Sequence, residues 1–215
     1  MFRVLLKLHK GEEIKYLSHR DVIRAFEFAL RRARIDVAYS SGFNPRPRMS
    51  FGSAIGVGVT SDDERIVLEL ASNQDACDIE ERLNSQLPDG LQVLETEVVS
   101  DGVKSPLSEL NASQFRITLE CDSEAINMAI EKILSSDEVR IVREREGKTK
   151  EIDIRPYISE INIVKADDRK VVIDVSLRSS DSGGASPKDF VQALRSLVSN
   201  LVVRKMHRLR HFHIS

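Results

Sequence analysis

The sequence predicts an α+β fold made of two tandem ferredoxin-like units with antiparallel sheets. Residues 1–100 show the order strand, helix, strand, strand, helix, strand, which is the βαββαβ order of that fold. Residues 114–215 repeat this order and add one hairpin. The length of 215 residues allows two domains of about 100 residues each.

The first half opens with an alternating strand at 2–10 and a basic amphipathic helix. Ser18 is expected to cap this helix, because Asp21 follows three residues later as in a capping box. The helix is predicted to run to about Arg34, with one apolar stripe and one stripe rich in arginine. The other elements expected in this half are extended segments at 36–40 and 49–59, strands at 64–71 and 91–99, and a helix at 73–87.

A polar segment, 101–113, is predicted to connect the two halves, because it contains glycine, proline and several serines. In the second half, Ser186 and Pro187 are expected to occupy the N-cap and first position of a helix at 187–198. The other expected elements are strands at 114–122 and 138–146, a helix at 123–136, a strand at 148–154 after a turn at Gly147, a hairpin at 159–179 and a last strand at 200–214.

Charge is unevenly distributed along the chain, although the net charge is only -2. Residues 1–54 contain eleven lysines and arginines against five acids, a local charge of +6, whereas the stretch 61–101 is acidic. Such segregation predicts an anionic partner for one surface. The competing interpretation is that these residues cluster only in the sequence and scatter in space.

The stretch YSSGFNPRPRMSFGSAIGVGV, residues 39–59, is the most distinctive one. Pro45 and Pro47 stiffen it, so Arg46 and Arg48 are presented with little entropy left to lose on binding a phosphate or carboxylate. Four glycines are expected to allow positive φ, and two phenylalanines, Phe43 and Phe51, are expected to stack on a base or ring. The plainer alternative is a crossover loop whose phenylalanines cover the core and whose Arg46 pairs with an acid such as Glu27.

Other candidate chemistry is weaker. The glycine-rich segment fits neither nucleotide-binding loop pattern. His19 at the start of the helix is a conceivable general base for RNA cleavage, but a surface or capping role is favoured. His207, His211 and His213 lack accompanying cysteines or carboxylates, so neither a metal site nor a cofactor is predicted. The two cysteines, Cys77 and Cys121, are expected to be free thiols in a cytoplasmic protein, and no apolar run is long enough for a membrane span.

A second charged stretch, residues 143–158, has two equally weighted interpretations. Alternating charges on a hairpin usually form a solvated face with cross-strand pairs. Alternatively, Lys148, Lys150 and Arg155 extend the basic site.

Three motifs, in the helix at 16–33, the loop at 39–47 and the hairpin at 147–156, resemble those of an uncharacterised bacterial domain family that is fused to, or encoded beside, B12-binding-type radical-SAM proteins. Two departures are Arg20, where the family often has leucine, and Arg48, where it usually has lysine. The resemblance implies no settled activity, but it implies a radical-SAM partner and a genomic setting near ribosomal proteins and ribonuclease G. The matching residues are Tyr16, Ser18, His19, Asp21, Arg24, Phe26 and 29–33 in the helix, Tyr39, Ser40, 42–45 and Pro47 in the loop, and Gly147, Lys148, Lys150, Glu151, Asp153, Arg155 and Pro156 in the hairpin.

These observations favour a non-catalytic module that binds tRNA or rRNA for a radical-SAM partner. The rivals are an RNA-processing or RNA-modifying enzyme and a protein-interaction module that docks the radical-SAM protein. The chain has no CxxxCxxC motif and is therefore not expected to be a radical-SAM enzyme itself. The predicted binding residues are Tyr16, His19, Arg24, Arg31, Tyr39, Gly42, Phe43, Asn44, Arg46, Arg48, Lys148, Lys150 and Arg155.

Overall fold

A computed structural model of the protein describes residues 2–100, 102–145, 147–180 and 183–214. Residues 1, 101, 146, 181, 182 and 215 are outside the described residues, so the predicted segments that include them are compared with the structure only at their other positions. The fold is mixed α+β with mostly antiparallel strands, and the described residues form four α-helices. The chain divides into two compact units, Met1–Leu110 and Asn111–Ser215, each of which is described by itself.

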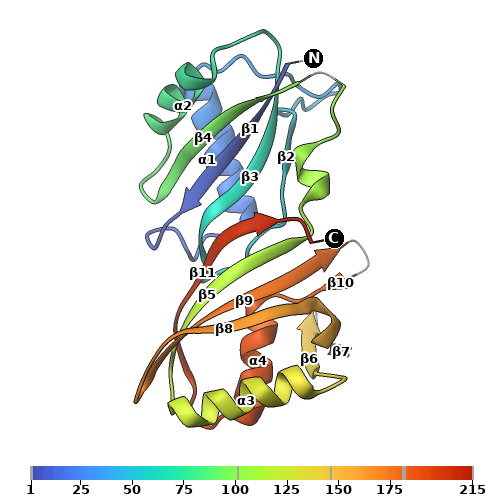
Figure 1. Ribbon diagram of the computed structural model, residues 1–215. Coiled ribbons are helices and arrows are strands. Elements are labelled where there is room, and N and C mark those ends of the chain that lie inside the picture. The colour runs from blue at the N-terminus through green and yellow to red at the C-terminus, as the bar shows by residue number, and fades with distance from the viewer. Residues whose placement is uncertain (1, 101, 146, 181–182, 215) are drawn as a thin grey trace. The chain divides into compact units, whose positions relative to one another are not determined.

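The first unit is a four-stranded antiparallel sheet with two helices on one face (Figure 1). Its strands lie in the order β4, β1, β3, β2. Side chains from α1 and from the strands beneath it form the core, among them Leu6, Phe26, Leu30 and Leu68. The elements are β1 (Phe2–Lys10), α1 (His19–Arg32), β2 (Met49–Phe51), β3 (Thr60–Leu70), α2 (Ala76–Asn84), β4 (Leu91–Val99) and the short 3₁₀ helix η1 (Pro106–Glu109).

The second unit is built on an antiparallel sheet with the strand order β8, β9, β5, β11. The short strand β10 also pairs with β9, and β6 and β7 form a separate two-stranded hairpin. The elements are β5 (Ala112–Glu120), α3 (Ser123–Ser135), β6 (Arg140–Arg145), β7 (Lys148–Asp153), η2 (Arg155–Tyr157), β8 (Ile158–Asp167), β9 (Lys170–Ser180), β10 (Gly183–Gly184), α4 (Pro187–Leu197) and β11 (Val202–Phe212).

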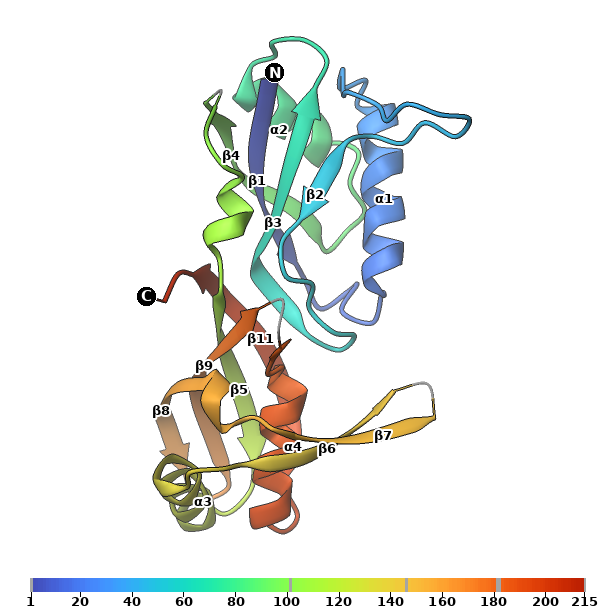
Figure 2. The same ribbon diagram turned by 90° about the vertical axis from the view of Figure 1, so that its right-hand side faces the viewer.

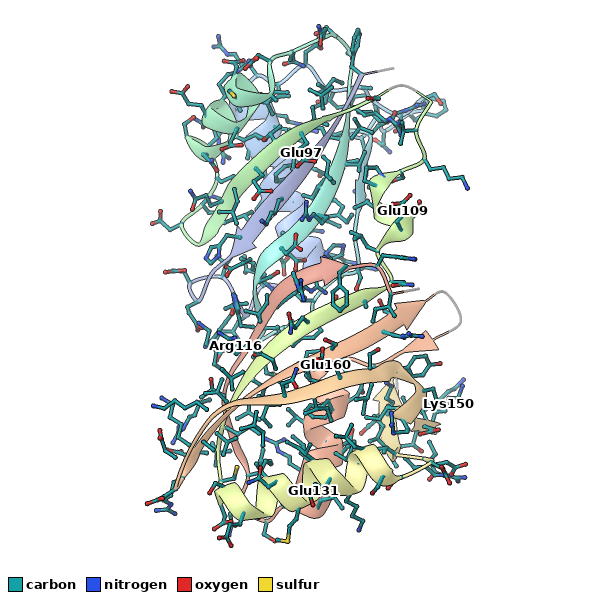
Figure 3. All side chains as sticks on the ribbon, in the orientation of Figure 1. Glu97, Glu109, Arg116, Glu131, Lys150 and Glu160 are labelled. Atoms are coloured by element: carbon teal, nitrogen blue, oxygen red, sulfur yellow. The ribbon has the colours of Figure 1, made fainter. Side chains whose placement is uncertain are left out.

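Strand alternation gives each sheet one apolar and one largely polar face. In β5, Phe115, Ile117 and Leu119 are buried, whereas Arg116 between them points to the other face. There Arg116 donates two hydrogen bonds, of 2.8 and 2.7 Å, to Asp174 on β9. Figure 3 labels Arg116 with two other charged side chains on the polar faces, Glu97 and Glu160.

Several predicted boundaries differ from the structure. Residues 36–40 form no continuous strand, and their pairings are the isolated bridges Val37 to Leu70 and Tyr39 to Pro47. The ladder stops there because the Ala38 N–H donates to the Glu69 carbonyl and the Arg46 N–H to the Ser40 hydroxyl. Of the predicted segment 49–59, only Met49–Phe51 is a strand. The helix expected at 73–87 is shorter, because Asp75 accepts the Asp78 N–H and caps it there. The segment 101–113 contains η1 and the first residues of β5.

Both predicted helix caps are present. Ser18 and Asp21 form a reciprocal capping box at the start of α1, as expected. Ser186 caps α4 with Pro187 at its first position, and Asp189 completes a capping box that the sequence analysis did not predict.

The C-terminus of α1 has the hydrogen bonds of a Schellman motif without its usual glycine. The Ile35 N–H donates to the Leu30 carbonyl and the Arg34 N–H to the Arg31 carbonyl, both at 3.1 Å. The residue in the left-handed conformation is Arg34, with φ of 53°. Arg82 of α2 fixes this turn, because its guanidinium donates to the carbonyls of Ala33 and Arg34. The turn sets the direction in which the chain leaves α1.

Candidate functional site

The exposed side of α1 carries arginines at helical spacing. Arg20, Arg24 and Arg31 are exposed, and we call them the arginine face. They lie opposite the buried side of the helix, where Phe26 and Leu30 pack into the core. None of the three makes an ion pair or a side-chain hydrogen bond within the described residues. The face is therefore a concentrated positive surface.

The acid nearest to this face by sequence, Asp21, is held by the helix cap. Hydrogen bonds from the Ser18 side chain and backbone lower the pKa of Asp21, and the charge of Arg24 lowers it further. Asp21 therefore stays ionised at neutral pH, and its hydrogen bonds keep it at the helix start.

Residues 38–48, which follow α1, form a closed projection that we call the arm (Figure 2). The Ser40 N–H donates to the Arg46 carbonyl at 2.9 Å, and the Arg48 N–H donates to the Ala38 carbonyl at 2.7 Å. A further bond of 3.1 Å joins the Arg46 N–H to the Ser40 hydroxyl. Pro47 is buried in this stem. The paired stem holds the tip, residues 41–45, away from the sheet.

The tip of the arm displays its aromatic side chain without cover. Phe43 is fully exposed, and its neighbours Gly42 and Asn44 are exposed as well. Gly42 has a φ of 126°, a backbone conformation that residues other than glycine rarely adopt. Tyr39 at the base of the arm is also exposed. The exposed ring of Phe43 therefore contributes nothing to the packing of the unit.

The two arginines of the arm face different parts of the first unit. Arg46 Nη1 lies 3.9 Å from Glu27 Oε1 on α1, which places Arg46 beside the arginine face. Arg48 Nη1 lies 3.3 Å from Glu69 Oε2 on β3. The side chains of Arg46 and Arg48 remain 76% and 45% exposed, and ion pairs of this kind contribute little. Both guanidiniums therefore keep donors available to a partner.

His19 and Phe51 pack against each other instead of facing solvent. Their rings meet edge to face, with centroids 5.2 Å apart, and both residues are half-buried. Burial lowers the pKa of His19, and the charge of Lys10 lowers it further, so the imidazole is neutral at pH 7. The contact with His19 and the packing of Phe51 against the core favour the plainer alternative for Phe51, a ring that covers the core. Tyr16, nearby in sequence, is exposed.

Of the four glycines expected to allow positive φ, Gly42 and Gly58 have it. Gly52 and Gly56 do not, and an added Cβ at Gly52 would make only ordinary contacts of 3.5 Å.

The basic residues predicted after residue 143 lie in the second unit. Lys148 and Lys150 are exposed on β7. Arg155 instead serves the fold: its Nη1 donates to the Ile158 carbonyl at 3.2 Å and its Nη2 to the Leu134 carbonyl at 3.1 Å. It thereby satisfies a carbonyl in the last turn of α3, so we expect it to contribute less to binding than the two lysines do.

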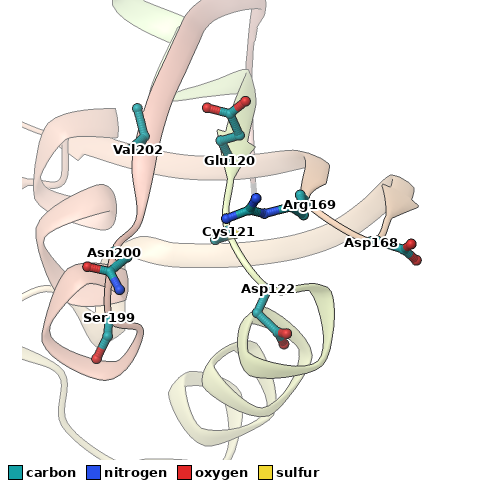
Figure 4. A pocket seen from close by; sticks show the side chains of 8 residues that line it. All are labelled: Glu120, Cys121, Asp122, Asp168, Arg169, Ser199, Asn200 and Val202. Atoms are coloured by element: carbon teal, nitrogen blue, oxygen red, sulfur yellow. The ribbon is translucent and has the colours of Figure 1, made fainter.

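The second unit also contains a polar pocket of about 450 Å³ that sequence reasoning missed (Figure 4). Its walls come from three separate chain segments, so no contiguous sequence motif indicates it. Burial raises the pKa of the Cys121 thiol, and the charge of Asp122 raises it further, so this cysteine is a protonated thiol at neutral pH. The lining residues are Glu120, Cys121, Asp122, Asp168, Arg169, Ser199, Asn200 and Val202.

The described residues contain neither a metal-binding cluster nor a membrane-spanning helix. Within them, no three His, Cys, Asp or Glu side chains are grouped to hold a metal ion. No helix in the same part of the chain is both long and apolar enough to cross a membrane.

Solved structures with a similar fold include proteins of RNA-containing complexes. An H/ACA ribonucleoprotein bound to a substrate RNA is similar with a TM-score of 0.51 and 10% identity, over 99% of this chain and 49% of that one. A Cbf5–Nop10–Gar1 complex gives 0.52 and 9% identity, over 99% and 50%. An archaeal box H/ACA Nop10–Cbf5 complex gives 0.51 and 10%, over 97% and 48%. The chain thus spans about half the length of these proteins, and the likeness concerns the fold.

No curated protein matches the chain significantly. A family model described as an uncharacterised protein conserved in bacteria, DUF2344, matches residues 3–187. Because the match covers most of the chain, including α1, the arm and the β6–β7 hairpin, the protein belongs to the DUF2344 family.

Proposed function

We propose that this protein is a non-catalytic module that binds structured RNA, tRNA or rRNA, through the arginine face and the arm. One observation carries the proposal: the fully exposed Phe43 stands at the tip of an anchored arm whose Arg46 lies beside the exposed arginines of α1. Exposed guanidiniums suit phosphates, and an exposed aromatic ring suits an unpaired base.

The side chains of this surface differ in the part of the RNA that they would contact. Arg24 and Arg31, one stripe along α1, contact successive phosphates and make binding sensitive to salt. Phe43 stacks on a base, an interaction worth about 1–3 kcal/mol per base. Asn44 and Tyr39 supply directional hydrogen bonds next to the ring. His19 is neutral and half-buried, so it adds no positive charge to the surface.

The structural neighbours support the choice of RNA as the partner. They come from H/ACA ribonucleoprotein complexes, one of them bound to a substrate RNA. At 9–10% identity they support the proposal through the fold only.

We further infer that both units are variants of the ferredoxin-like plan. In the first unit the strand order is β4, β1, β3, β2, and in the second β11, β5, β9, β8 occupy the corresponding order. The β6–β7 hairpin is then an insertion between α3 and β8.

Two further parts of the proposal come from the sequence: the module has a radical-SAM protein as its partner, and it is located in the cytoplasm.

The test compares the wild-type protein with R24A/R31A, measuring fluorescence anisotropy of a labelled single-stranded RNA between about 50 and 200 mM salt. Loss of two phosphate contacts reduces the slope of log Kd against log salt by about 1.4. The matched control is K132A/R195A, which removes two exposed cations from helices of the second unit and leaves the slope unchanged.

Two results would contradict the proposal. One is the absence of salt-sensitive binding of wild-type protein to total tRNA and rRNA. The other is equal binding by R24A/R31A and its control. If Phe43→Ala abolished capture of the radical-SAM protein while RNA binding was never detected, the arm would be a protein-docking element instead.

A further inference from the structure

The β6–β7 hairpin sorts its charged residues by face. Residues directly opposite each other in the antiparallel pair share a face. One face carries the pairs Ile141 with Ile152 and Arg143 with Lys150, followed by the position of Lys148. The alternate face carries the pairs Arg140 with Asp153, Val142 with Glu151 and Glu144 with Thr149. The alternating sequence therefore collects lysines on one face and acids on the other.

The two faces differ in how their charges are satisfied. On the acidic face, Arg140 lies 2.8 Å from Glu138 and 3.9 Å from Glu151. On the basic face, Lys148 and Lys150 are exposed and form no ion pair within the described residues. The register places Lys150 directly across from Arg143.

The root of the hairpin is held firmly against α4. Arg143 Nε and Nη2 donate to the two Asp189 carboxylate oxygens at 3.0 and 2.6 Å, and Nη2 also donates to the Gly184 carbonyl at 2.6 Å. Gln192 adds a bond of 2.9 Å to the Val142 carbonyl. Because Arg143 is neutralised by Asp189, the available charges among the described side chains of this face are the two lysines. Figure 2 shows the hairpin projecting from the unit, and Figure 3 labels Lys150 on it.

We propose that this basic face, Lys148 and Lys150, binds the phosphate backbone of a double-stranded RNA stem. Neither strand contains an aromatic residue, so the hairpin offers no ring for an unpaired base. Two lysine side chains at alternate positions stand about 7 Å apart along the strand and act as point charges, which suits backbone contact without sequence readout. Shape and backbone recognition is how proteins usually bind duplex RNA.

This inference rests on the proposed RNA-binding function and specifies the RNA. The arm, with Phe43, takes unpaired nucleotides, whereas the hairpin takes a stem. The ligand class is therefore an RNA that contains both features, and the two elements contribute separately to its affinity.

The experiment measures binding of a blunt RNA duplex and of a single strand of equal length to the full chain over a salt series. K148A/K150A reduces the salt slope for the duplex by about 1.8, because two phosphate contacts are lost, and leaves the slope for the single strand unchanged. K148E/K150E weakens duplex binding further. The control K132A/R195A changes neither slope.

The possible failures are distinguishable. Duplex binding by K148E/K150E at the wild-type level overturns the inference, as does a wild-type protein that binds single strands but not duplexes; the role of the arm stands in both cases. Wild-type protein that binds neither RNA overturns the proposed function and this inference together. Circular dichroism of both variants confirms that the exposed substitutions leave the fold intact.

Discussion

Arg46 on the arm and Glu27 on α1 lie 3.9 Å apart, and this contact joins the arm to the basic helix. Glu27 is mostly buried, whereas Arg46 is largely exposed. The acid therefore sits within the row of arginines and reduces the positive potential of the surface that we propose for RNA. The contact shows where the arm approaches α1, and the charge of Glu27 opposes phosphate binding at that point.

Glu27→Gln is expected to tighten RNA binding about threefold at 100 mM salt, because it removes one negative charge near several phosphate contacts. Glutamine keeps the size of the side chain and a hydrogen-bond acceptor for Arg46. Anisotropy titration with single-stranded RNA measures the change. Glu131→Gln, an exposed acid on α3, is the control and leaves the affinity unchanged. Weaker binding by Glu27→Gln would mean that orienting Arg46 matters more than the charge.

Phe43→Ala is expected to weaken binding of single-stranded RNA about tenfold, since stacking on one base is lost. The salt slope stays the same, because no charge is removed. Stability to urea also stays the same, as the ring buries nothing in the folded protein. The control Met128→Ala removes another exposed apolar side chain, on α3, and has no effect on either property. A loss of stability without a loss of affinity would show that the ring serves the fold.

Much of the first unit could be predicted from the sequence, because its signals are local. The alternation in β1 and the capping box at Ser18 each lie within a few residues, and so does the apolar stripe of α1. The strand expected at 36–40 failed for a non-local reason. Its N–H groups pair with two different segments: the Ser40 N–H donates to the Arg46 carbonyl within the arm, whereas the Ala38 N–H donates to the Glu69 carbonyl on β3.

The candidate site was only partly predictable. The exposure of Phe43 and the burial of Phe51 have the same sequence signal, an aromatic residue in a glycine-containing loop. Only the tertiary contact with His19 separates them. Likewise, the sequence does not distinguish Arg155 from Lys148 and Lys150. In the structure, the Arg155 guanidinium donates to the carbonyl of Leu134, which belongs to α3. The polar pocket around Cys121 draws on three segments and has no local signal at all.

Arg143→Ala is expected to lower the free energy of unfolding by about 2 kcal/mol at pH 7, because it leaves the buried Asp189 carboxylate without its cation. Burial alone would raise the pKa of Asp189, but hydrogen bonds from Arg143 and Ser186 outweigh it and hold the pKa below the ordinary value of 3.8. A carboxyl with a lowered pKa stabilises the fold above the pKa of the unfolded chain, and this stabilisation is lost as the pH falls through the folded pKa.

The difference between wild-type protein and Arg143→Ala should therefore be full at pH 7 and shrink below about pH 4. Urea unfolding at both pH values measures it. Arg140→Ala is the matched control: its ion pair with Glu138 is exposed, so its loss changes stability by less than about 0.5 kcal/mol. Equal effects of the two substitutions at pH 7 would show that the contact with Asp189 does not hold the hairpin.

Arg34→Gly is expected to stabilise the protein and weaken RNA binding together. Arg34 occupies the glycine position of the Schellman motif with φ of 53°, and a side chain there costs about 1–2 kcal/mol. Glycine removes this strain but has more freedom in the unfolded chain, so the net gain is about 0.5 kcal/mol. The bonds from Arg82 to the Ala33 and Arg34 carbonyls are unaffected. The guanidinium of Arg34, an exposed cation just beyond the end of α1, is lost.

Arg34→Ala separates the two effects, because it removes the charge and keeps the Cβ that causes the strain. Both variants should lose the same affinity for single-stranded RNA, about twofold to threefold at 100 mM salt, whereas only Arg34→Gly gains stability in urea. Unchanged affinity in both variants would confine the binding surface to Arg20, Arg24, Arg31 and the arm. The need for a positive charge would then explain why a strained arginine occupies a position that suits glycine better. The cost is backbone strain at the C-terminus of α1.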